Sequence, residues 1–406
     1  MKILLVTPFL PYPGVPHAGG KLAFHLLSFL AREHSVHLVS RIFPGEEAHL
    51  PILGKIVGGL DIVAAKGPLV PGSFLSLART VASYRHLARK AHEALRRGRF
   101  DFCQVEYTET AVFFSPPTNL PSALSLHDVI AKPARRRYEI SRGADRVFAW
   151  IGWRIRRSLE GRAISRFRLV FTLSDVDREW AERLYPVGRF RVLRYPAGLE
   201  FLGLQRREIL GRVLFVGALN RTQNMEAVRY IVRHVWPSVR KKCPDAEFRV
   251  VGAGMADAFR EELERVPGVR AVGFVDRVED EYMSARVFVA PILEGGGIIV
   301  KILDAMAAGV PVVTTPFGNE GIGAASGEEI LVADHPERFA EAVALFLVNG
   351  AENVRIGEAG RRFVGRFFSP EAFAVVVRST LRELAGGVDG PSSASPRDDE
   401  IPGKET

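Results

Sequence analysis

Residues 287–313 read VFVAPILEGGGIIVKILDAMAAGVPVV, and this stretch decides the fold. A buried strand at 287–290 leads through three glycines into a helix, and a second strand follows at 310–314. Glycines without Cβ atoms let a ligand approach the backbone. The helix start behind them offers unpaired N–H groups and a partial positive charge to an anion such as a diphosphate.

The same alternation of strands and helices runs through both halves of the chain. In the first half we expect strands at residues 2–7, 36–39, 60–64, 102–105, 123–126 and 169–173, and a helix at 21–32. In the second half we expect strands at 213–216, 248–251, 287–290 and 310–314, and a core-packed amphipathic helix at 225–240. Most of these strands are too apolar to face solvent on either side, which is typical of parallel sheets covered on both faces. The sequence therefore predicts an α/β protein.

A break in this pattern marks the domain boundary. Residues 196–211 bring Pro196, Gly198 and Gly203 together with a charged run, as an interdomain linker does. We expect two Rossmann-like domains, at 1–205 and 206–368. A C-terminal helix at 369–385 is expected to pack back on the N-terminal domain, and the tail at 386–406 has too few apolar residues to fold.

Composition narrows the setting. The 406 residues carry 55 Lys and Arg against 46 Asp and Glu, a formal net charge of +9 that favours anionic partners. Cys103 and Cys243 lie far apart, so the sequence supports neither a disulfide framework nor a cysteine-rich metal site. No apolar run reaches the roughly 18 to 20 residues of a membrane-spanning helix. We expect a soluble, cytoplasmic protein.

The middle of the N-terminal half is strongly basic. Residues 135–137, 154–157 and 162–168 are rich in arginine, with Trp150 and Trp153 between them. Such a face suggests peripheral contact with a membrane surface or an anionic acceptor. The alternative is a solvated helix face with ordinary core aromatics. No motif supports nucleic acid as a partner.

Three side chains near strand ends and glycine turns are candidates for chemistry. Lys301 and Asp304 lie three residues apart on one helical face, where they could offer a cation to phosphate and a carboxylate to ribose hydroxyls. The alternative is a solvated pair. His127 follows a strand at the edge where α/β proteins bind ligands, unless it is a structural histidine that caps the turn. Glu106 is a weaker candidate for the cleft.

The segment 295–313 resembles the retaining GT-B glycosyltransferases of family four. The resemblance covers nearly all of residues 212–366, and it is looser at Gly19-Gly20 before the first helix, at 125–128 (SLHD) and at 195–198 (YPAG). It implies a GT-B fold with two Rossmann-like domains facing across a cleft. It also implies a hexosyltransferase-like enzyme of polysaccharide biosynthesis that needs no cofactor. That enzyme would transfer sugar with retention from a UDP- or GDP-sugar to a glycan, lipid-linked or small-molecule acceptor.

The resemblance also assigns residues. Catalytic roles fall to His127, Lys301 and Asp304. Glu320, expected in a loop, is assigned a contact with a sugar or ribose hydroxyl. The implied donor-binding residues are Gly19, Gly20, Gly217, Arg221, Asn224, Glu294, Gly295, Gly296, Gly297, Ile298, Lys301, Asp304 and Glu320. The sequence shows no evident metal site, so fixed cations and backbone amides are expected in place of a metal.

Two departures from the family pattern leave alternatives open. The family commonly has two glutamates eight positions apart; the second is Asp304 here, and the first falls at Gly296. Ile298-Ile299 stand where a related branch has Thr-Arg, which puts more weight on Lys301 and Arg221. A catalytically inactive GT-B module and a nucleotide-sugar 2-epimerase therefore remain alternatives. A dinucleotide oxidoreductase is poorly supported, because the Gly-x-Gly-x-x-Gly fingerprint does not follow the first strand.

Overall fold

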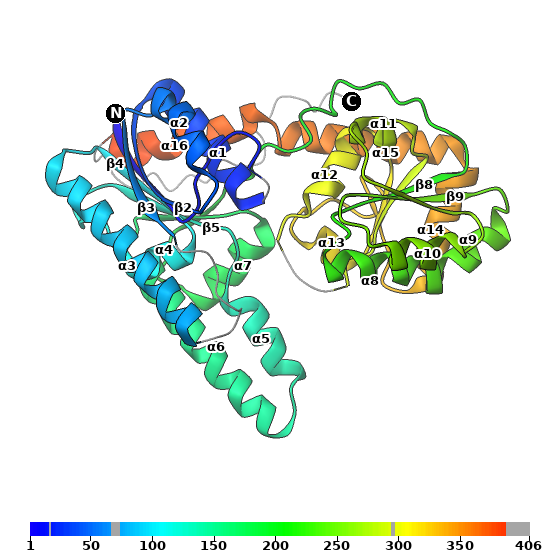
Figure 1. The fold of residues 1–406 in the computed structure, drawn as a ribbon, viewed down its shortest axis with the longest axis horizontal. Coiled ribbons are helices and arrows are strands. Elements are labelled where there is room, and N and C mark those ends of the chain that lie inside the picture. Colours follow the sequence, from blue (N-terminus) through cyan, green and yellow to red (C-terminus); the bar gives the residue numbers. More distant parts are fainter. Residues whose placement is uncertain (16–17, 66–73, 294–296, 387–406) are drawn as a thin grey trace, which may run out of the picture.

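The computed structural model describes residues 1–15, 18–65, 74–293 and 297–386. These residues form two parallel sheets, each covered by helices on both faces (Figure 1). The α/β class with two Rossmann-like units is therefore confirmed.

The N-terminal sheet has, within the described residues, seven strands in the order β3-β2-β1-β4-β5-β6-β7. They are β1 (Lys2–Thr7), β2 (Ser35–Ile42), β3 (Gly59–Ala64), β4 (Phe102–Glu106), β5 (Ser122–Leu126), β6 (Leu169–Thr172) and β7 (Phe190–Val192). The helices are α1 (Ala18–Glu33), α2 (Leu50–Ile56), α3 (Phe74–Arg97), α4 (Thr108–Phe113), α5 (Ala131–Ile140), α6 (Gly143–Ile164) and α7 (Asp175–Leu184). The strand order reverses between β1 and β4, which is where such sheets open a ligand crevice.

The C-terminal sheet has, in the described part of the chain, six strands in the order β10-β9-β8-β11-β12-β13. They are β8 (Arg212–Val216), β9 (Glu247–Val251), β10 (Val269–Gly273), β11 (Val287–Ala290), β12 (Val312–Thr314) and β13 (Leu331–Val332). The helices are α8 (Thr222–Tyr230), α9 (Trp236–Lys242), α10 (Asp257–Glu264), α11 (Val278–Ser284), α12 (Val300–Ala307), α13 (Pro316–Glu320), α14 (Pro336–Val348) and α15 (Gly350–Phe367).

The core of each domain follows from strand alternation. In β1, Ile3 and Leu5 pack on one face of the sheet, and Leu4 and Val6 pack on the other. All four side chains are fully buried. A strand with both faces buried must be apolar throughout, which is why it reads as a continuous run rather than as an alternating one.

Each strand predicted from sequence forms, and the differences lie at the edges and in one helix. β7, β10 and β13 were not predicted. β12 begins at Val312 rather than at residue 310, because the Val310 N–H donates to the Ala305 carbonyl and Pro311 has no N–H. The helix predicted at 225–240 forms within a continuous helical run from Thr222 to Lys242, but a π-helical segment at Ile231–Val235 joins α8 to α9 just before Pro237.

The last helix, α16 (Pro370–Ala385), returns to the N-terminal domain. Its buried side chains Phe373, Val377, Leu381 and Leu384 join the core cluster that contains Ile3 and Leu5. The chain thus crosses between the domains twice, once through residues 196–211 and once at the start of α16. Among the described helices, none combines the length and apolar character that crossing a membrane requires.

The first crossing packs tightly on α12. Gly198 has φ +65°, and a Cβ there would stand 2.5 Å from the Ala307 Cβ and 3.1 Å from the Leu303 carbonyl oxygen. Gly203, in the same crossing, has open space around its Cβ position. Glycine is therefore needed at 198 for both backbone conformation and space.

We expect Leu381→Ala to destabilise the protein by ~2–5 kcal/mol, because it leaves a cavity where α16 enters the N-terminal core. Val375→Ala, on the same helix but 66% exposed, is the matched control, with an expected change within ~0.5 kcal/mol. Denaturant unfolding monitored by circular dichroism measures both. Equal losses would contradict the packing of α16 described above.

Gly198→Ala should destabilise the protein by ~1–3 kcal/mol, because alanine is strained at this φ and its methyl group meets α12. Gly203→Ala should have little effect. The same unfolding measurement tests the pair. A Gly198→Ala protein as stable as wild type would show that the linker does not press on α12.

Candidate functional site

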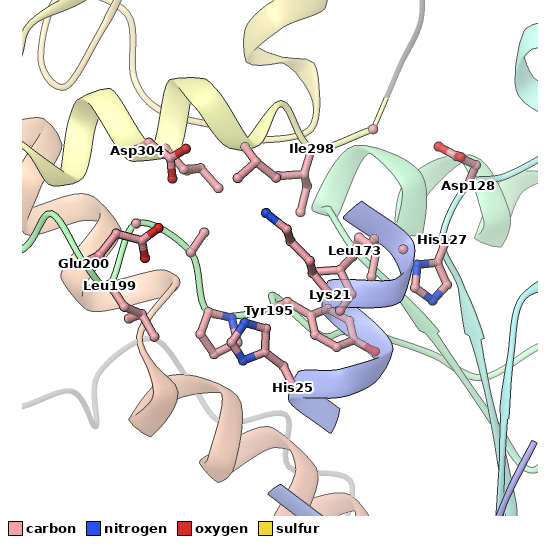
Figure 2. A pocket seen from close by; sticks show the side chains of 18 of the residues that line it. Lys21, His25, His127, Asp128, Leu173, Tyr195, Leu199, Glu200, Ile298 and Asp304 are labelled. Carbon is pink, nitrogen blue, oxygen red and sulfur yellow. The ribbon is translucent and has the colours of Figure 1, made fainter. Parts of the chain in front are cut away.

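A cavity of about 370 Å³ lies between the two domains and is lined by both. Its lining residues are Gly19, Lys21, Leu22, His25, Tyr107, His127, Asp128, Leu173, Tyr195, Pro196, Ala197, Gly198, Leu199, Glu200, Gly297, Ile298, Val300, Leu303 and Asp304. Figure 2 shows Lys21 of α1 reaching toward α12, with Asp304 and Glu200 on one side and His127 and Asp128 on the other. The cavity is large enough for a small-molecule ligand.

α12 presents its first turn and Asp304 to this cavity. Ile299 precedes the helix in an extended conformation and makes no side-chain cap, so the first backbone N–H groups need partners from elsewhere. Gly297, at φ +80°, lies so close to the N-terminal domain that a Cβ there would stand 3.1 Å from Asp128 Oδ1. The helix start therefore faces the N-terminal domain across a narrow gap.

Asp304 is an unusual carboxylate. Burial, and after it the nearby Glu200 carboxylate, raise its pKa to about 7 against the opposing effect of Lys21. A half-protonated carboxyl beside a second carboxylate suits a ligand that donates hydrogen bonds, because such donors stabilise the charged form.

Lys301 points away from Asp304 into the C-terminal domain. Its ammonium donates to Asn224 Oδ1 at 2.9 Å and lies 4.3 Å from the centre of the Phe215 ring. Burial lowers its pKa to about 8. Gly217 belongs to the same cluster, because a Cβ there would stand about 3.0 Å from the Asn224 amide. Three of the predicted donor residues thus meet beside β8, next to α12.

His127 is held by a buried carboxylate that sequence reasoning ranked as a weaker candidate. Glu106 is fully buried, and its Oε2 lies 2.8 Å from His127 Nε2. Its Oε1 accepts hydrogen bonds from Ser125 Oγ at 2.7 Å and from Gln104 Nε2 at 2.8 Å. The carboxylate oxygen accepts a hydrogen bond from Nε2–H. Nδ1 is the ring nitrogen that takes no part in this contact.

Tyr107 completes the support of His127. Its ring stacks on the imidazole at 3.7 Å between centroids and 1° between planes. Tyr107 has φ +73°, a conformation that costs energy and, among the described residues, occurs at no other non-glycine position. Its hydroxyl occupies the space that a Cβ at Gly19 would need. Gly19 is therefore required for the close approach of α1 to this ring.

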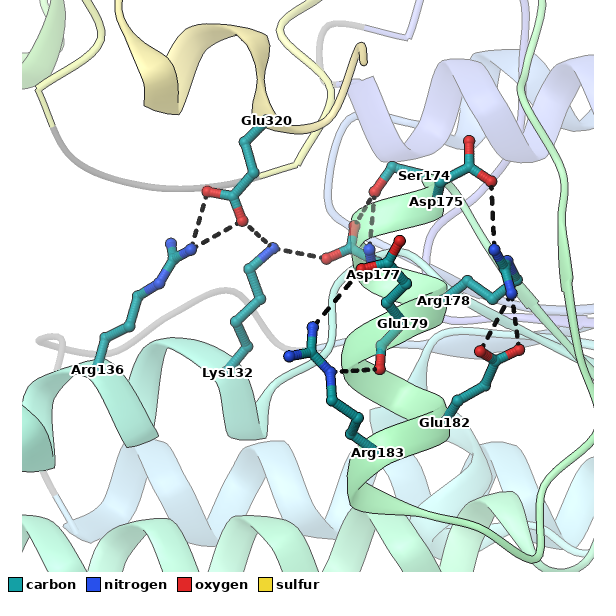
Figure 3. A network of polar contacts seen from close by, with 10 residues as sticks. All are labelled: Lys132, Arg136, Ser174, Asp175, Asp177, Arg178, Glu179, Glu182, Arg183 and Glu320. Atoms are coloured by element: carbon teal, nitrogen blue, oxygen red, sulfur yellow. Dashed lines mark hydrogen bonds and ion pairs between the residues drawn. The ribbon is translucent and has the colours of Figure 1, made fainter. Parts of the chain in front are cut away.

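An ion network joins the two domains beside the cavity (Figure 3). Lys132 Nζ of α5 lies 2.7 Å from Asp177 Oδ1 and 2.6 Å from Glu320 Oε1. Arg136 Nη2 donates to both Glu320 oxygens, at 2.8 and 2.9 Å. The expected loop position of Glu320 is wrong: it is the last residue of α13, and its carboxylate faces these cations.

The structure brings some of the predicted residues together and separates others. Gly19, His127, Gly297, Ile298 and Asp304 line the cavity. Gly20 is buried within the first turn of α1, so the expectation that the glycine pair precedes this helix is wrong. Arg221 is exposed at the residue before α8. Glu294, Gly295 and Gly296 lie outside the described residues.

Four further side chains of the cavity were missed from sequence. Lys21 and His25 lie one turn apart on α1, and this four-residue spacing behind the glycine pair was the available signal. Tyr107 and Glu200 carry no such signal. Among the described residues, no group of three or more His, Cys, Asp and Glu side chains is arranged to hold a metal ion.

The raised pKa of Asp304 predicts a pH-dependent stability. The folded protein holds this proton more tightly than the unfolded chain, so stability falls as pH rises from the ordinary carboxyl pKa of about 4 to about 7 and then levels off. Asp304→Asn should be more stable than wild type at pH 8, by ~1 kcal/mol or more, and should lose most of this advantage near pH 4, where the unfolded carboxyl is also largely protonated. Denaturant unfolding at both pH values measures the difference. Asp276 is exposed, so Asp276→Asn controls for the loss of a charge as such. The same difference in unfolding free energy between Asp304→Asn and wild type at both pH values would refute the prediction.

Comparison with known proteins identifies the fold and one domain. Residues 211–349 match the family model described as "Glycosyl transferases group 1". Over 150 residues the chain is 30% identical to an uncharacterized 44.6 kDa protein in the cps region of Klebsiella pneumoniae. That match covers 35% of this chain and only 37% of the Klebsiella protein.

Solved structures match over nearly the whole chain. HepE of Anabaena, in complex with UDP, has a TM-score of 0.65 at 13% identity, and sucrose-phosphate synthase of Thermosynechococcus elongatus has 0.65 at 17%. WaaG, a glycosyltransferase involved in lipopolysaccharide biosynthesis, has 0.61 at 15%. Each match covers 95% of this chain and 100% of the other. The chain therefore has the GT-B glycosyltransferase fold, and its C-terminal domain carries the sequence pattern of the group 1 glycosyl transferases.

Proposed function

We propose that this protein is a glycosyltransferase that transfers sugar from a nucleotide-diphosphate sugar to a glycan, lipid-linked or small-molecule acceptor. The observation that carries the proposal is the first turn of α12 together with Asp304, both lining a cavity shared by the two domains. The family match over residues 211–349 places this helix in the part of the chain that resembles sugar transferases.

The donor is proposed to bind to the C-terminal side of the cavity. Its diphosphate accepts hydrogen bonds at the start of α12, near Gly297 and Ile298, where backbone N–H groups and the helix dipole favour an anion. Asp304 accepts hydrogen bonds from ribose hydroxyls. HepE was solved with UDP and with UDP-glucose, which supports a UDP-sugar, with a GDP-sugar as the alternative.

Lys301 and Arg221 supply the positive charge in this proposal. The Lys301 ammonium is anchored by Asn224 one helical turn from Asp304, and a diphosphate nearby would raise its pKa again from about 8. Arg221 is exposed and free to turn toward the phosphates. In this proposal these two cations and the backbone amides take the place that a metal ion has in other transferases.

Transfer is proposed to proceed with retention, as in family four. The bond from the anomeric carbon to the diphosphate oxygen breaks, and the acceptor oxygen forms the new bond to that carbon. The acceptor hydroxyl gives its proton to the departing phosphate oxygen. Negative charge grows on the leaving group, and the α12 dipole and Lys301 stabilise it. His127, oriented by Glu106, holds a sugar hydroxyl near the reacting carbon.

The proposed setting is the cytoplasm, with peripheral contact to the inner face of the membrane through the basic part of the N-terminal domain. A lipid-linked acceptor would then lie beside the N-terminal side of the cavity. In this proposal the C-terminal domain binds the donor and the N-terminal domain binds the acceptor.

A thermal-shift screen of UDP-, GDP-, ADP- and dTDP-sugars tests the donor. A ligand at 100 times its Kd stabilises the folded protein by about 2.7 kcal/mol, which should appear as a raised Tm. Lys301→Ala and Asp304→Ala should remove both this shift and transfer, by at least about 100-fold in rate. Asp276→Asn, exposed in the same domain, should keep both.

The same assay separates the alternatives. A chelator should leave transfer unchanged, because no metal takes part. A Tm shift without turnover against any acceptor would indicate an inactive binding module, and epimerised free donor would indicate a 2-epimerase. Full activity of both alanine variants would refute the site.

A further inference from the structure

The hairpin of α5 and α6 is the part of the N-terminal domain that the proposed site does not explain. Both helices extend away from the two sheets (Figure 1). On the inner face of the hairpin, Tyr138 stacks on Trp153 with 5.9 Å between ring centroids. Arg146 lies over the Tyr138 ring and Arg157 over the Trp153 ring. The inner face therefore holds the hairpin together and leaves the outer face of α6 to solvent.

Apolar side chains cover this outer face. Val147, Ile151, Ile155 and Leu159 recur at every fourth position of α6, so they form one stripe along the helix, and each is at least 40% exposed. Phe148, beside the stripe, is 73% exposed. A contiguous exposed patch of this kind marks an interaction surface, whereas scattered apolar residues do not.

The same hairpin is strongly basic. Between residues 131 and 164 there are ten Lys and Arg against three Asp and Glu, so the hairpin holds +7 of the formal +9 of the chain. Seven of its arginines form no ion pair with any carboxylate in the described part of the chain. They are Arg137, Arg142, Arg146, Arg154, Arg156, Arg157 and Arg162. A partner for this surface must therefore be apolar and anionic together.

We propose that the outer face of α6 docks onto an anionic phospholipid bilayer. The stripe enters the boundary between headgroups and acyl chains, and the arginines reach the lipid phosphates with their charged ends. Phosphatidylglycerol or another anionic lipid supplies the negative charge that these arginines do not receive from carboxylates in the described part of the chain. A second copy of this chain fits less well, because pairing two such faces would bring unneutralised arginines together.

A depression between the helices supports the same partner. It has a volume of about 420 Å³, and its lining includes Arg137, Arg156 and the side chain of Phe148. Two guanidinium groups beside an apolar wall suit a phosphate headgroup with its attached hydrocarbon. The hairpin thus has both an apolar face that can contact the bilayer and a depression that can bind a lipid headgroup.

The surface refines the membrane contact in the proposed function by giving it residues. α5 begins three residues after Asp128, which lines the cavity. Docking by α6 would therefore hold the N-terminal side of the cleft near the bilayer. Vesicle binding requires no donor. A protein that fails to bind vesicles could therefore still transfer sugar as proposed, and a protein that fails to transfer sugar could still bind vesicles.

Co-sedimentation of the full chain with vesicles tests the proposal. The vesicles are phosphatidylcholine alone or equal parts of phosphatidylcholine and phosphatidylglycerol. The wild type should sediment with the anionic vesicles only. The triple variant Phe148→Ser, Ile151→Ser, Ile155→Ser should bind the anionic vesicles at least about tenfold more weakly than wild type, because it loses most of the inserted apolar surface.

Matched variants make the result specific. Val348→Ser, Val354→Ser, Val375→Ser removes three apolar side chains of comparable exposure elsewhere and should bind as wild type does. Arg154→Gln, Arg162→Gln leaves the stripe intact and should weaken binding to anionic vesicles. A triple variant that binds as wild type does would overturn the proposal. So would a wild-type dimer in size-exclusion chromatography that the triple variant converts to monomer.

Discussion

The contact between the interdomain linker and α12 is the constraint on which the site depends. Gly198 lies against the backbone of Leu303 and the methyl group of Ala307, a distance that only glycine allows. This contact presses the linker onto the helix that carries Asp304, so burial and, after it, the carboxylate of Glu200 two residues later raise the pKa of Asp304. Asp304 then shares a cavity wall with residues from the N-terminal domain. A looser linker would leave Asp304 as an ordinary solvated carboxylate.

Two further features fix the domains relative to each other. α16 inserts Phe373 and Leu381 into the N-terminal core, so the second crossing of the chain is anchored by apolar burial. On the other side of the cleft, Glu320 meets the buried Lys132 and the partly exposed Arg136. Ion pairs of this kind are strong only while every charge keeps its partner. Apolar burial therefore fixes the second crossing, and ion pairs join the two domains on the other side of the cleft.

Sequence predicts the centre of each sheet better than its edges. The central strands are buried on both faces and read as apolar runs, whereas β10 mixes buried Val269 and Ala271 with exposed Arg270 and gives no such run. His127 could be placed because it ends a predicted strand. The direction of Lys301 could not: three residues on a helix differ by about 60°, enough to turn Lys301 toward Asn224 and Asp304 toward the cavity. The partners of Glu320 come from residues more than 180 positions earlier, and no local pattern reports them.

The α5–α6 hairpin and the cleft are mechanically connected, because Lys132 and Arg136 belong to both. One end of α5 holds Glu320 of the C-terminal domain, and the other leads to the exposed turn before α6. Arg136 also lies 5.5 Å from the centre of the Phe317 ring, so its contact with α13 is apolar as well as ionic. A force on the hairpin would therefore reach the domain interface through a single helix of ten residues. Docking of the hairpin, as proposed above, would thus act next to the ion pairs that join the two domains.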